Sequence, residues 1–344
     1  MRTLIISATL AAFSATSLAQ TTTPAPAPTM PAPATPAPTA PAMPAPAMQP
    51  AQPMTTPMMN TPMTPIKMGS AMMNGKIPAS GTIEVNGAKV YFRSVGAGKP
   101  MMLIHGYPLS GELFRDNRAA LAAAGFQVIT VDLPGFGKSV APSKEASIEN
   151  YARTMLGAMD ALGLKTATVG GMSMGGMTLL QMYKMAPTRF NALVFIDTTA
   201  DPAGPAEAAG WRGNAQQAQE QGVASLVPGL LPRMLSGVSR MKMPAQVAFL
   251  SGIVKQASLN GAVGGGNALA ARPDANPILA TIKVPTLLVF GVEDNVTPVE
   301  LAMKMQKGIA GSKLVLIPGA GHAATFEKAS ATNAAIISFA KTLK

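Results

Sequence analysis

Six short apolar runs recur beyond residue 100, and stretches with helical periodicity separate them. They lie at residues 101–104, 127–131, 167–169, 192–196, 285–290 and 313–317, with helices expected at 111–124, 148–162, 174–185, 298–308 and 323–343. Continuous apolar strands that alternate with helices are typical of a parallel sheet covered on both faces. Upstream, residues 81–92 alternate apolar and polar side chains around Asn86-Gly87, a strong β-hairpin signal. The sequence therefore predicts an α/β protein with a mostly parallel sheet of about eight strands.

The first 79 residues have a different character. Residues 1–19 combine Arg2, a short apolar stretch and a small-residue cleavage site at Ser17-Leu18-Ala19, which is the pattern of a secretory signal peptide. A retained membrane anchor is the alternative, but the apolar run is about half of the ~20 residues that a spanning helix needs. Cleavage would leave no transmembrane segment. An exported protein, periplasmic or extracellular, is therefore expected.

Of the 31 prolines, 15 fall in residues 20–66, which contain no charged residue. Such a stretch cannot bury enough apolar area to offset its ordering entropy, so residues 20–79 are expected to be a disordered linker. The remaining residues, 80–344, are long enough for one α/β domain with an insertion.

Lysine and arginine outnumber acidic residues by 27 to 16, and the formal net charge is +11. The basic residues fall singly along the predicted domain and aromatic residues make up only 5% of the chain, so nucleic-acid binding is not expected. A basic surface favours weak association with anionic polymers of the cell envelope. The chain has no cysteine, which excludes a thiol nucleophile, a cysteine-bound zinc ion and a lipid-modified cysteine.

The sharpest motif follows the apolar run at 167–169 and begins a helical pattern. It reads Gly171-Met172-Ser173-Met174-Gly175-Gly176, a G-x-S-x-G nucleophile elbow in the strand-turn-helix context that it requires. The turn is so tight that side chains at Gly171 and Gly175 would collide with neighbouring backbone, whereas Ser173 stands at its tip. A chance match to the pentapeptide is common in a glycine-rich chain but rare between a strand and a helix. Ser173 is therefore the predicted nucleophile.

A serine hydroxyl needs a base to remove its proton, and the chain has only two histidines. His105 follows the run at 101–104, and His322 follows the run at 313–317. In folds that carry a nucleophile elbow of this kind, the expected chain order is nucleophile, acid, histidine, so the base must come after Ser173. His322 is the predicted base.

The imidazole in turn needs a carboxylate to fix its tautomer. Asp294 is the first choice because it comes directly after the run at 285–290. Glu293 is the fallback, since adjacent side chains cannot both point at one ring, although a solvated loop charge or a helix cap explains it equally well. Asp197, at the end of the run at 192–196, is a further alternative.

An oxyanion hole requires backbone donors at the same edge of the sheet. The N–H of Met174, just after the nucleophile, and the N–H of Tyr107, in the loop after residues 101–104, are the expected pair. In that loop, His105 and Gly106 are expected to play a supporting part, with His105 ordering the loop by hydrogen bonding rather than transferring protons. This chemistry requires neither a metal ion nor a cofactor.

Residues 80–344 resemble the α/β-hydrolase superfamily. The resemblance rests on motifs in the family's order, namely His105-Gly106-Tyr107-Pro108-Leu109-Ser110, Asp132-Leu133-Pro134-Gly135-Phe136-Gly137-Lys138-Ser139, the Ser173 elbow, Asp294 and Gly321-His322. The His-Gly-x-Pro loop is similar to that of arylesterases and of cofactor-free haloperoxidase or perhydrolase relatives. Epoxide hydrolases and haloalkane dehalogenases of this fold carry Asp at the elbow, so Ser173 argues against both.

The resemblance also implies a helical cap inserted at about residues 199–281. Within it, residues 206–220 favour a helix, residues 226–235 are apolar but broken by proline, and Val247, Leu250, Val254 and Ala257 form a helical stripe. The glycine-rich residues 261–266 are predicted to be a flexible hinge for the cap. Trp211 either anchors the cap or lines its pocket.

These residues together predict a serine hydrolase that cleaves a small or medium hydrophobic carboxylic ester through an acyl-enzyme intermediate. Met172, Met174 and Met177 favour a hydrophobic acyl or aryl group. Two alternatives remain open. One is perhydrolysis or carbon-carbon bond cleavage by the same residues, and the other is a non-catalytic binding module on the same fold.

Overall fold

The amino-terminal hairpin follows from the alternation of its residues. In the computed structural model, which describes residues 76–343, β1 (Ser80–Val85) pairs antiparallel with β2 (Ala88–Val95). The turn residues Asn86 and Gly87 both have positive φ angles, 51° and 77°, as a two-residue type I′ turn requires. The predicted signal peptide and nearly all of the predicted linker lie outside the described residues.

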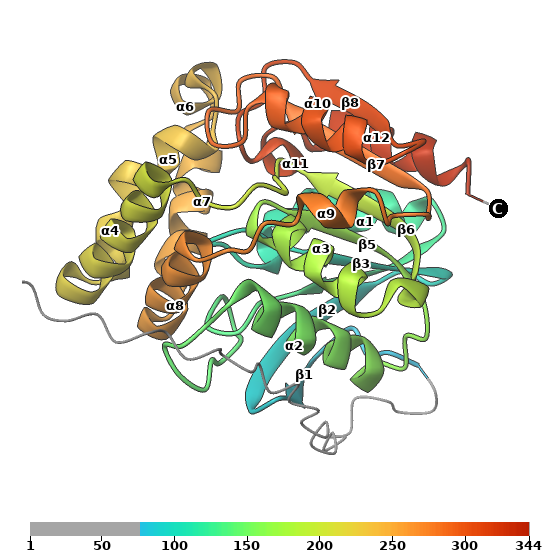
Figure 1. Cartoon of the computed structure of the whole chain (residues 1–344), viewed down its shortest axis with the longest axis horizontal. Helices are drawn as coiled ribbons and strands as arrows, with labels where there is room; N and C mark the ends of the chain where they lie inside the picture. The colour runs from blue at the N-terminus through green and yellow to red at the C-terminus, as the bar shows by residue number, and fades with distance from the viewer. Residues whose placement is uncertain (1–75, 344) are drawn as a thin grey trace, which may run out of the picture. The chain divides into compact units, whose positions relative to one another are not determined.

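Six parallel strands extend this hairpin into an eight-stranded sheet, as predicted (Figure 1). They are β3 (Lys99–Ile104), β4 (Phe126–Val131), β5 (Ala167–Met172), β6 (Phe190–Ile196), β7 (Thr286–Gly291) and β8 (Lys313–Ile317). The spatial order is β1-β2-β4-β3-β5-β6-β7-β8, so the chain reverses its direction across the sheet around β3. Ligands of open parallel sheets bind outside the carboxyl ends of the strands at such a reversal. Here that place is the end of β3 and β5.

Helices cover both faces of the sheet because parallel crossovers are right-handed. The crossover from β3 to β4, through η1 (Gly111–Phe114) and α1 (Arg115–Ala123), moves across the sheet toward β2. Three other crossovers move across the sheet toward β8, and they pass through α2 (Ile148–Ala161), α3 (Met174–Met185) and α10 (Val299–Gly308). Consequently α2 packs on α3, whereas α1 packs on α12 (Ala329–Ala340) against the opposite face (Figure 1). Every residue of β5 and β7 is therefore buried.

The helix predicted over residues 323–343 is divided into two. The short helix α11 (Ala324–Glu327) ends at Lys328, whose φ and ψ of −127° and 50° are not helical, and α12 begins at the next residue. At this break the side chain of Glu327 is buried. The helix predicted over residues 111–124 corresponds to η1 followed by α1, and the other three predicted helices agree with the structure to within one residue at each end. None of the helices between residues 76 and 343 is long and apolar enough to cross a membrane.

The residues between β6 and β7 form a series of helices, most of which lie together at one end of the sheet (Figure 1, yellow to orange). We call residues 199–281 the cap. Its helices are α4 (Pro205–Gln221), η3 (Val223–Leu226), α5 (Val227–Met234), α6 (Gly237–Lys242), α7 (Pro244–Lys255), α8 (Leu259–Ala270) and α9 (Asn276–Leu279). Pro232 lies inside α5 without ending it at that residue, in contrast to the predicted break.

The flexible hinge predicted at residues 261–266 is wrong. These residues lie inside α8, and none of its glycines has a positive φ. A Cβ atom on Gly265 would lie 2.7 Å from the ring of Tyr107, and one on Gly266 would lie 3.0 Å from the carbonyl oxygen of Trp211. The glycines therefore serve close packing of α8 against the core and against α4, and they do not provide backbone freedom.

Candidate active site

Ser173 occupies the turn between β5 and α3, and its backbone is held in an unusual conformation. Its φ and ψ of 54° and −119° lie in a region that residues with a Cβ atom rarely adopt. Its N–H donates to the carbonyl oxygen of Ile196 at 2.9 Å, and its own carbonyl oxygen accepts from Thr198 Oγ1 at 2.7 Å. The end of β6 therefore fixes this turn from the side.

The glycines around Ser173 are required by close approach. A Cβ atom on Gly171 would lie 2.5 Å from the carbonyl carbon of Gly175, and one on Gly175 would lie 2.7 Å from the carbonyl oxygen of His105. A Cβ atom on Gly106 would lie 2.8 Å from Ser173 Cβ. These distances leave no room for a side chain, so the elbow and the loop after β3 meet directly at Ser173.

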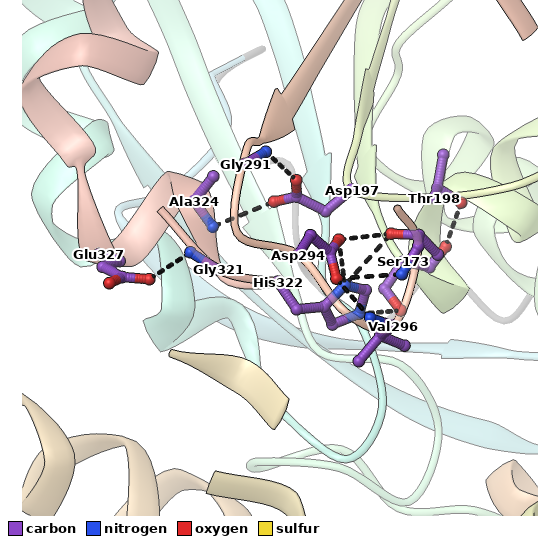
Figure 2. A network of polar contacts seen from close by, with 11 residues as sticks. Ser173, Asp197, Thr198, Gly291, Asp294, Val296, Gly321, His322, Ala324 and Glu327 are labelled. Atoms are coloured by element: carbon purple, nitrogen blue, oxygen red, sulfur yellow. Dashed lines mark hydrogen bonds and ion pairs between the residues drawn. The ribbon is translucent and has the colours of Figure 1, made fainter. Parts of the chain in front are cut away.

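The structure brings Ser173, His322 and Asp294 together from three separate loops (Figure 2). His322 Nε2 lies 2.9 Å from Ser173 Oγ, and His322 Nδ1 lies 2.8 Å from Asp294 Oδ2. A carboxylate next to Nδ1 favours the tautomer with the proton on that nitrogen, which leaves Nε2 free to accept from the hydroxyl. All three side chains are buried, and Ser173 is 8% exposed.

Asp294 is held as an ionised acceptor by its surroundings. Its Oδ1 accepts from the backbone N–H groups of Val296 and Thr297 at 2.7 and 3.0 Å, and Thr297 Oγ1 donates to its Oδ2 at 2.6 Å. Burial raises the pKa of Asp294, but the charge and hydrogen bond of His322 and the hydrogen bonds of Thr297 lower it further, so the net pKa is below its ordinary value. A group with this pKa is a carboxylate at neutral pH.

The two alternative acids do not contact the His322 ring in the described residues. Glu293 is exposed. Asp197 is fully buried, and its two oxygens accept from the backbone N–H groups of Gly291 at 2.7 Å and Ala324 at 3.0 Å. Burial, together with the nearby charge of Asp294, raises the pKa of Asp197 well above its ordinary value.

His105 lies in the loop after β3 and both of its ring nitrogens are engaged. Nδ1 donates to the carbonyl oxygen of Gly106 at 2.8 Å, and Nε2 accepts from the N–H of Leu133 at 2.9 Å. Burial lowers the pKa of His105, and the opposing charge of Asp132 only partly compensates. The ring is therefore neutral and joins the loops after β3 and β4.

The N–H of Met174 is at the start of α3, directly after Ser173, and the N–H of Tyr107 directly follows Gly106, which lies close to Ser173. Neither donates a hydrogen bond to any group within residues 76–343. The Tyr107 side chain is anchored to the cap, because its hydroxyl donates to the carbonyl oxygen of Ala262 at 2.9 Å. Its ring packs edge-on against Trp211 at 5.8 Å between centroids. Trp211 thus anchors the cap to the loop that carries Tyr107.

Glu327 is a buried polar residue that sequence reasoning did not select. It is 3% exposed, and it accepts hydrogen bonds from the cap and from the loop that carries His322. A signal for it exists in the sequence, because Glu327 is the only acidic residue between positions 301 and 344 and stands five positions after His322.

Comparisons with known proteins agree with this fold. A family model described as the alpha/beta hydrolase fold matches residues 99–329. A putative non-heme chloroperoxidase from Synechocystis is 29% identical over 73% of this chain and 94% of its own length. A thermophilic esterase from Thermogutta terrifontis aligns with a TM-score of 0.74 and 27% identity over 77% of this chain and 99% of the esterase. The enol-lactonase from Burkholderia xenovorans aligns with a TM-score of 0.72 and 25% identity, over 76% of this chain and 100% of the lactonase. The chain therefore belongs to the alpha/beta hydrolase fold family.

Proposed function

We propose that this hydrolase cleaves a small or medium hydrophobic carboxylic ester through an acyl-enzyme intermediate on Ser173. The observation that carries the proposal is the continuous pair of contacts from Ser173 Oγ to His322 Nε2 at 2.9 Å and from His322 Nδ1 to Asp294 Oδ2 at 2.8 Å. A hydroxyl, an imidazole and a carboxylate in this order activate a nucleophile on several unrelated folds. Similarity to an esterase and an enol-lactonase supports an ester or lactone substrate.

In the proposed acylation step, Ser173 Oγ attacks the carbonyl carbon while His322 Nε2 takes the hydroxyl proton. Asp294 stabilises the imidazolium that forms. The carbonyl oxygen becomes an oxyanion and accepts hydrogen bonds from the free N–H groups of Met174 and Tyr107. One such donor contributes a factor on the order of 10² to 10³ in kcat. His322 then gives the proton to the alkoxide, which leaves as the alcohol.

In the proposed deacylation step, water takes the place of the alcohol. His322 Nε2 removes a proton from the water as its oxygen attacks the acyl carbon, and the oxyanion again forms between the same two N–H groups. The bond between the acyl carbon and Ser173 Oγ breaks, and Oγ recovers the proton from His322. The carboxylic acid is released and the enzyme returns to its starting state.

An apolar acyl group is supported by the side chains near Ser173. Met174 and Met177 lie in the first turn of α3, and both are buried, as are the rings of Tyr107 and Trp211. Hydrolysis rates for p-nitrophenyl esters of increasing acyl length measure this preference. We expect kcat/KM to rise from acetate to a short or medium chain and to fall for long chains.

The test of the nucleophile uses Ser173→Ala with Ser143→Ala as a control, since Ser143 is an exposed loop serine. A fluorophosphonate probe should label the wild-type chain and Ser143→Ala once, at Ser173, and should not label Ser173→Ala. Turnover of p-nitrophenyl butyrate should fall by a factor on the order of 10⁴ to 10⁶ in Ser173→Ala. A loss of only a few-fold would remove Ser173 from the mechanism, and a folded wild-type chain that takes no label would support a non-catalytic binding module.

A second activity, perhydrolysis, is favoured by the similarity to the Synechocystis protein described as a putative non-heme chloroperoxidase. In this reaction hydrogen peroxide replaces water in deacylation, and the product is a peracid. The assay supplies acetate and hydrogen peroxide and measures peracid by oxidation of a halide. Peracid formation that depends on Ser173 and exceeds ester hydrolysis under matched conditions would make perhydrolysis the principal activity.

We further propose that the chain acts outside the cytoplasm, with residues 1–19 removed as a signal peptide. The support is the pattern of Arg2, the short apolar run and the small residues before position 20. Cell fractionation followed by intact-mass measurement should find a mature chain that begins at Gln20. The excess of basic residues supports weak, salt-sensitive association with anionic envelope polymers, which sedimentation with isolated envelopes at low and high salt measures.

A further inference from the structure

We call residues 321–324 the His322 segment. Hydrogen bonds to three groups outside this segment hold it in place. Three of its backbone N–H groups donate, Gly321 to Glu327 Oε2 at 2.7 Å, Ala323 to Met234 O at 2.8 Å and Ala324 to Asp197 Oδ2 at 3.0 Å. His322 thus stands between two residues whose N–H groups are bound by buried carboxylates, as Figure 2 shows for Gly321 and Ala324. The position of the imidazole is set by these partners as well as by Asp294.

Glu327 connects this segment to the cap. Its carboxylate accepts from the N–H of Ser236 at 3.1 and 3.2 Å and from the Ser236 hydroxyl, in addition to Gly321. Within residues 76–343 it forms no ion pair with a lysine or arginine. Burial of an unpaired carboxylate is costly unless hydrogen bonds satisfy it. The donors from the cap and from the His322 segment are therefore what keeps Glu327 in place.

The cap and the His322 segment also touch through their backbones. A Cβ atom on Gly321 would lie 2.8 Å from Ser236 N and 2.9 Å from the carbonyl carbon of Leu235. Ser236 is in addition the N-cap of α6, because its Oγ accepts from the N–H of Ser239 at 3.2 Å. A displacement of the junction between α5 and α6 therefore acts directly on the residue that precedes His322.

We propose that Glu327 is a positioning residue. It couples the position of Met234 to Ser236, the part of the cap that contacts the His322 segment, to the orientation of His322. This inference rests on the proposed function of His322 as the base. The carboxylate needs acceptor oxygens on both sides, one for Gly321 and one for Ser236. A glutamine at this position presents an amide NH₂ to at least one of these donors, which separates the two segments. A displacement of about 1 Å at a reacting group costs a factor on the order of 10² in rate.

The test compares Glu327→Gln, Ser236→Ala and the double variant with Asp160→Asn as a matched control. Asp160 lies on α2 and its carboxylate pairs with Arg189, away from the candidate site. Glu327→Gln should lower kcat for p-nitrophenyl acetate by a factor of about 10 to 100 with little change in KM. Ser236→Ala removes one of the donors and should cause a smaller loss. The double variant should be no slower than Glu327→Gln, because both changes act on the same link.

Nuclear magnetic resonance gives a readout that does not depend on activity, since the chain has only two histidines. In Glu327→Gln the Nδ1–H resonance of His322 should shift and broaden, while the resonances of His105 stay in place. A folded Glu327→Gln variant with a wild-type kcat and an unmoved His322 resonance overturns the proposal. A lower melting temperature with unchanged kcat and resonance also overturns it, because Glu327 would then only support the fold.

If Glu327→Gln does not fold, Ser236→Ala decides, and unchanged kcat and His322 resonance in that variant overturn the proposal. An inactive wild-type chain would instead contradict the proposed function. In that case a shifted His322 resonance in Glu327→Gln would still establish the coupling between the cap and the His322 segment.

Discussion

The strained backbone at Ser173 leads to a prediction that separates stability from activity. With φ at 54° and ψ at −119°, Ser173 occupies a conformation that only glycine adopts without strain, and such strain costs about 1–3 kcal/mol. Ser173→Ala and Ser173→Gly both remove the hydroxyl, and only the first retains the Cβ atom. The difference between the two variants therefore measures the strain energy, apart from the ordinary effect of replacing alanine by glycine.

That ordinary effect has two parts. Glycine loses about 0.5–1 kcal/mol more backbone entropy on folding than alanine, and removal of one buried methyl group costs about 0.8 kcal/mol. At a site with normal backbone angles the sum is a loss of about 1.3–1.8 kcal/mol. Ala192 in β6 is such a site, since it is fully buried in a strand and does not have a positive φ. At position 173 the relief of about 1–3 kcal/mol opposes this loss, so Ser173→Gly should range from ~0.8 kcal/mol less stable to ~1.7 kcal/mol more stable than Ser173→Ala.

The assay is equilibrium unfolding in urea, followed by circular dichroism. Ala192→Gly should lose about 1.3–1.8 kcal/mol relative to the wild-type chain. The step from Ser173→Ala to Ser173→Gly should be more favourable than this loss by about 1–3 kcal/mol. If alanine-to-glycine replacement costs the same at both positions, no strain is stored at Ser173 and the reasoning fails. Both variants at position 173 should lack turnover.

Three further predictions concern other parts of the site. Asp294→Asn should favour the wrong imidazole tautomer and lower kcat for p-nitrophenyl esters by a factor on the order of 10⁴; a loss below tenfold would assign the role of Asp294 to another group. Burial lowers the pKa of His105 below its ordinary value of 6.5. As the pH falls below about 6.5, His105 therefore takes up a proton more readily in the unfolded chain than in the folded chain, and this favours unfolding. The stability of the wild-type chain relative to His105→Gln should therefore decline there by up to about 1.4 kcal/mol per pH unit, measured by urea unfolding at pH 8, 6 and 5; parallel curves would contradict this. Gly175→Ala should lose more than about 3 kcal/mol and all activity, because its Cβ would overlap the backbone after β3. Gly210→Ala, at an open position of α4, should gain about 0.5–1 kcal/mol, and equal melting temperatures for the two variants would refute the steric argument.

Much of the fold was predictable because the pattern of apolar residues and the positions of the turn residues indicate the same strands and helices. Most of the apolar runs correspond to strands buried on both faces, such as β5 and β7, which need no alternation, and Asn86-Gly87 marks a turn with two positive φ angles. The elbow was predictable because its motif lies between an apolar run and a helical pattern, and Gly171 is required by its close approach to Gly175 within the turn. Gly175 is required by the backbone of His105, which lies far away in the chain. Features that depend on residues close together in the sequence can therefore be predicted from it.

Features that depend on distant partners were not predictable in the same way. The sequence of residues 261–266 predicts a hinge wrongly because glycine serves both backbone freedom and close packing, and which of the two applies depends on Tyr107 and Trp211, which lie far away in the chain. Position in the sequence makes Asp294 the first choice of acid, but only the contacts of His322 separate it from Glu293 and Asp197. Glu327 was not predicted because its role depends on hydrogen-bond donors of the cap, which lie far away in the chain.

The start of α8 has a consequence for how molecules reach Ser173. Gly135 O accepts from both the N–H and the Oγ of Ser258 at 2.9 Å, and a Cβ atom on Gly135 would lie 2.5 Å from Gly261 Cα. The cap is thus joined to the core here and again beside His322, so we expect it not to swing away from the sheet as a rigid body. We therefore expect molecules to reach Ser173 by a passage between the side chains of the cap. Substitutions in that passage alter which molecules are admitted while the bond-breaking residues stay as they are, which leaves such a scaffold free to acquire new preferences one residue at a time.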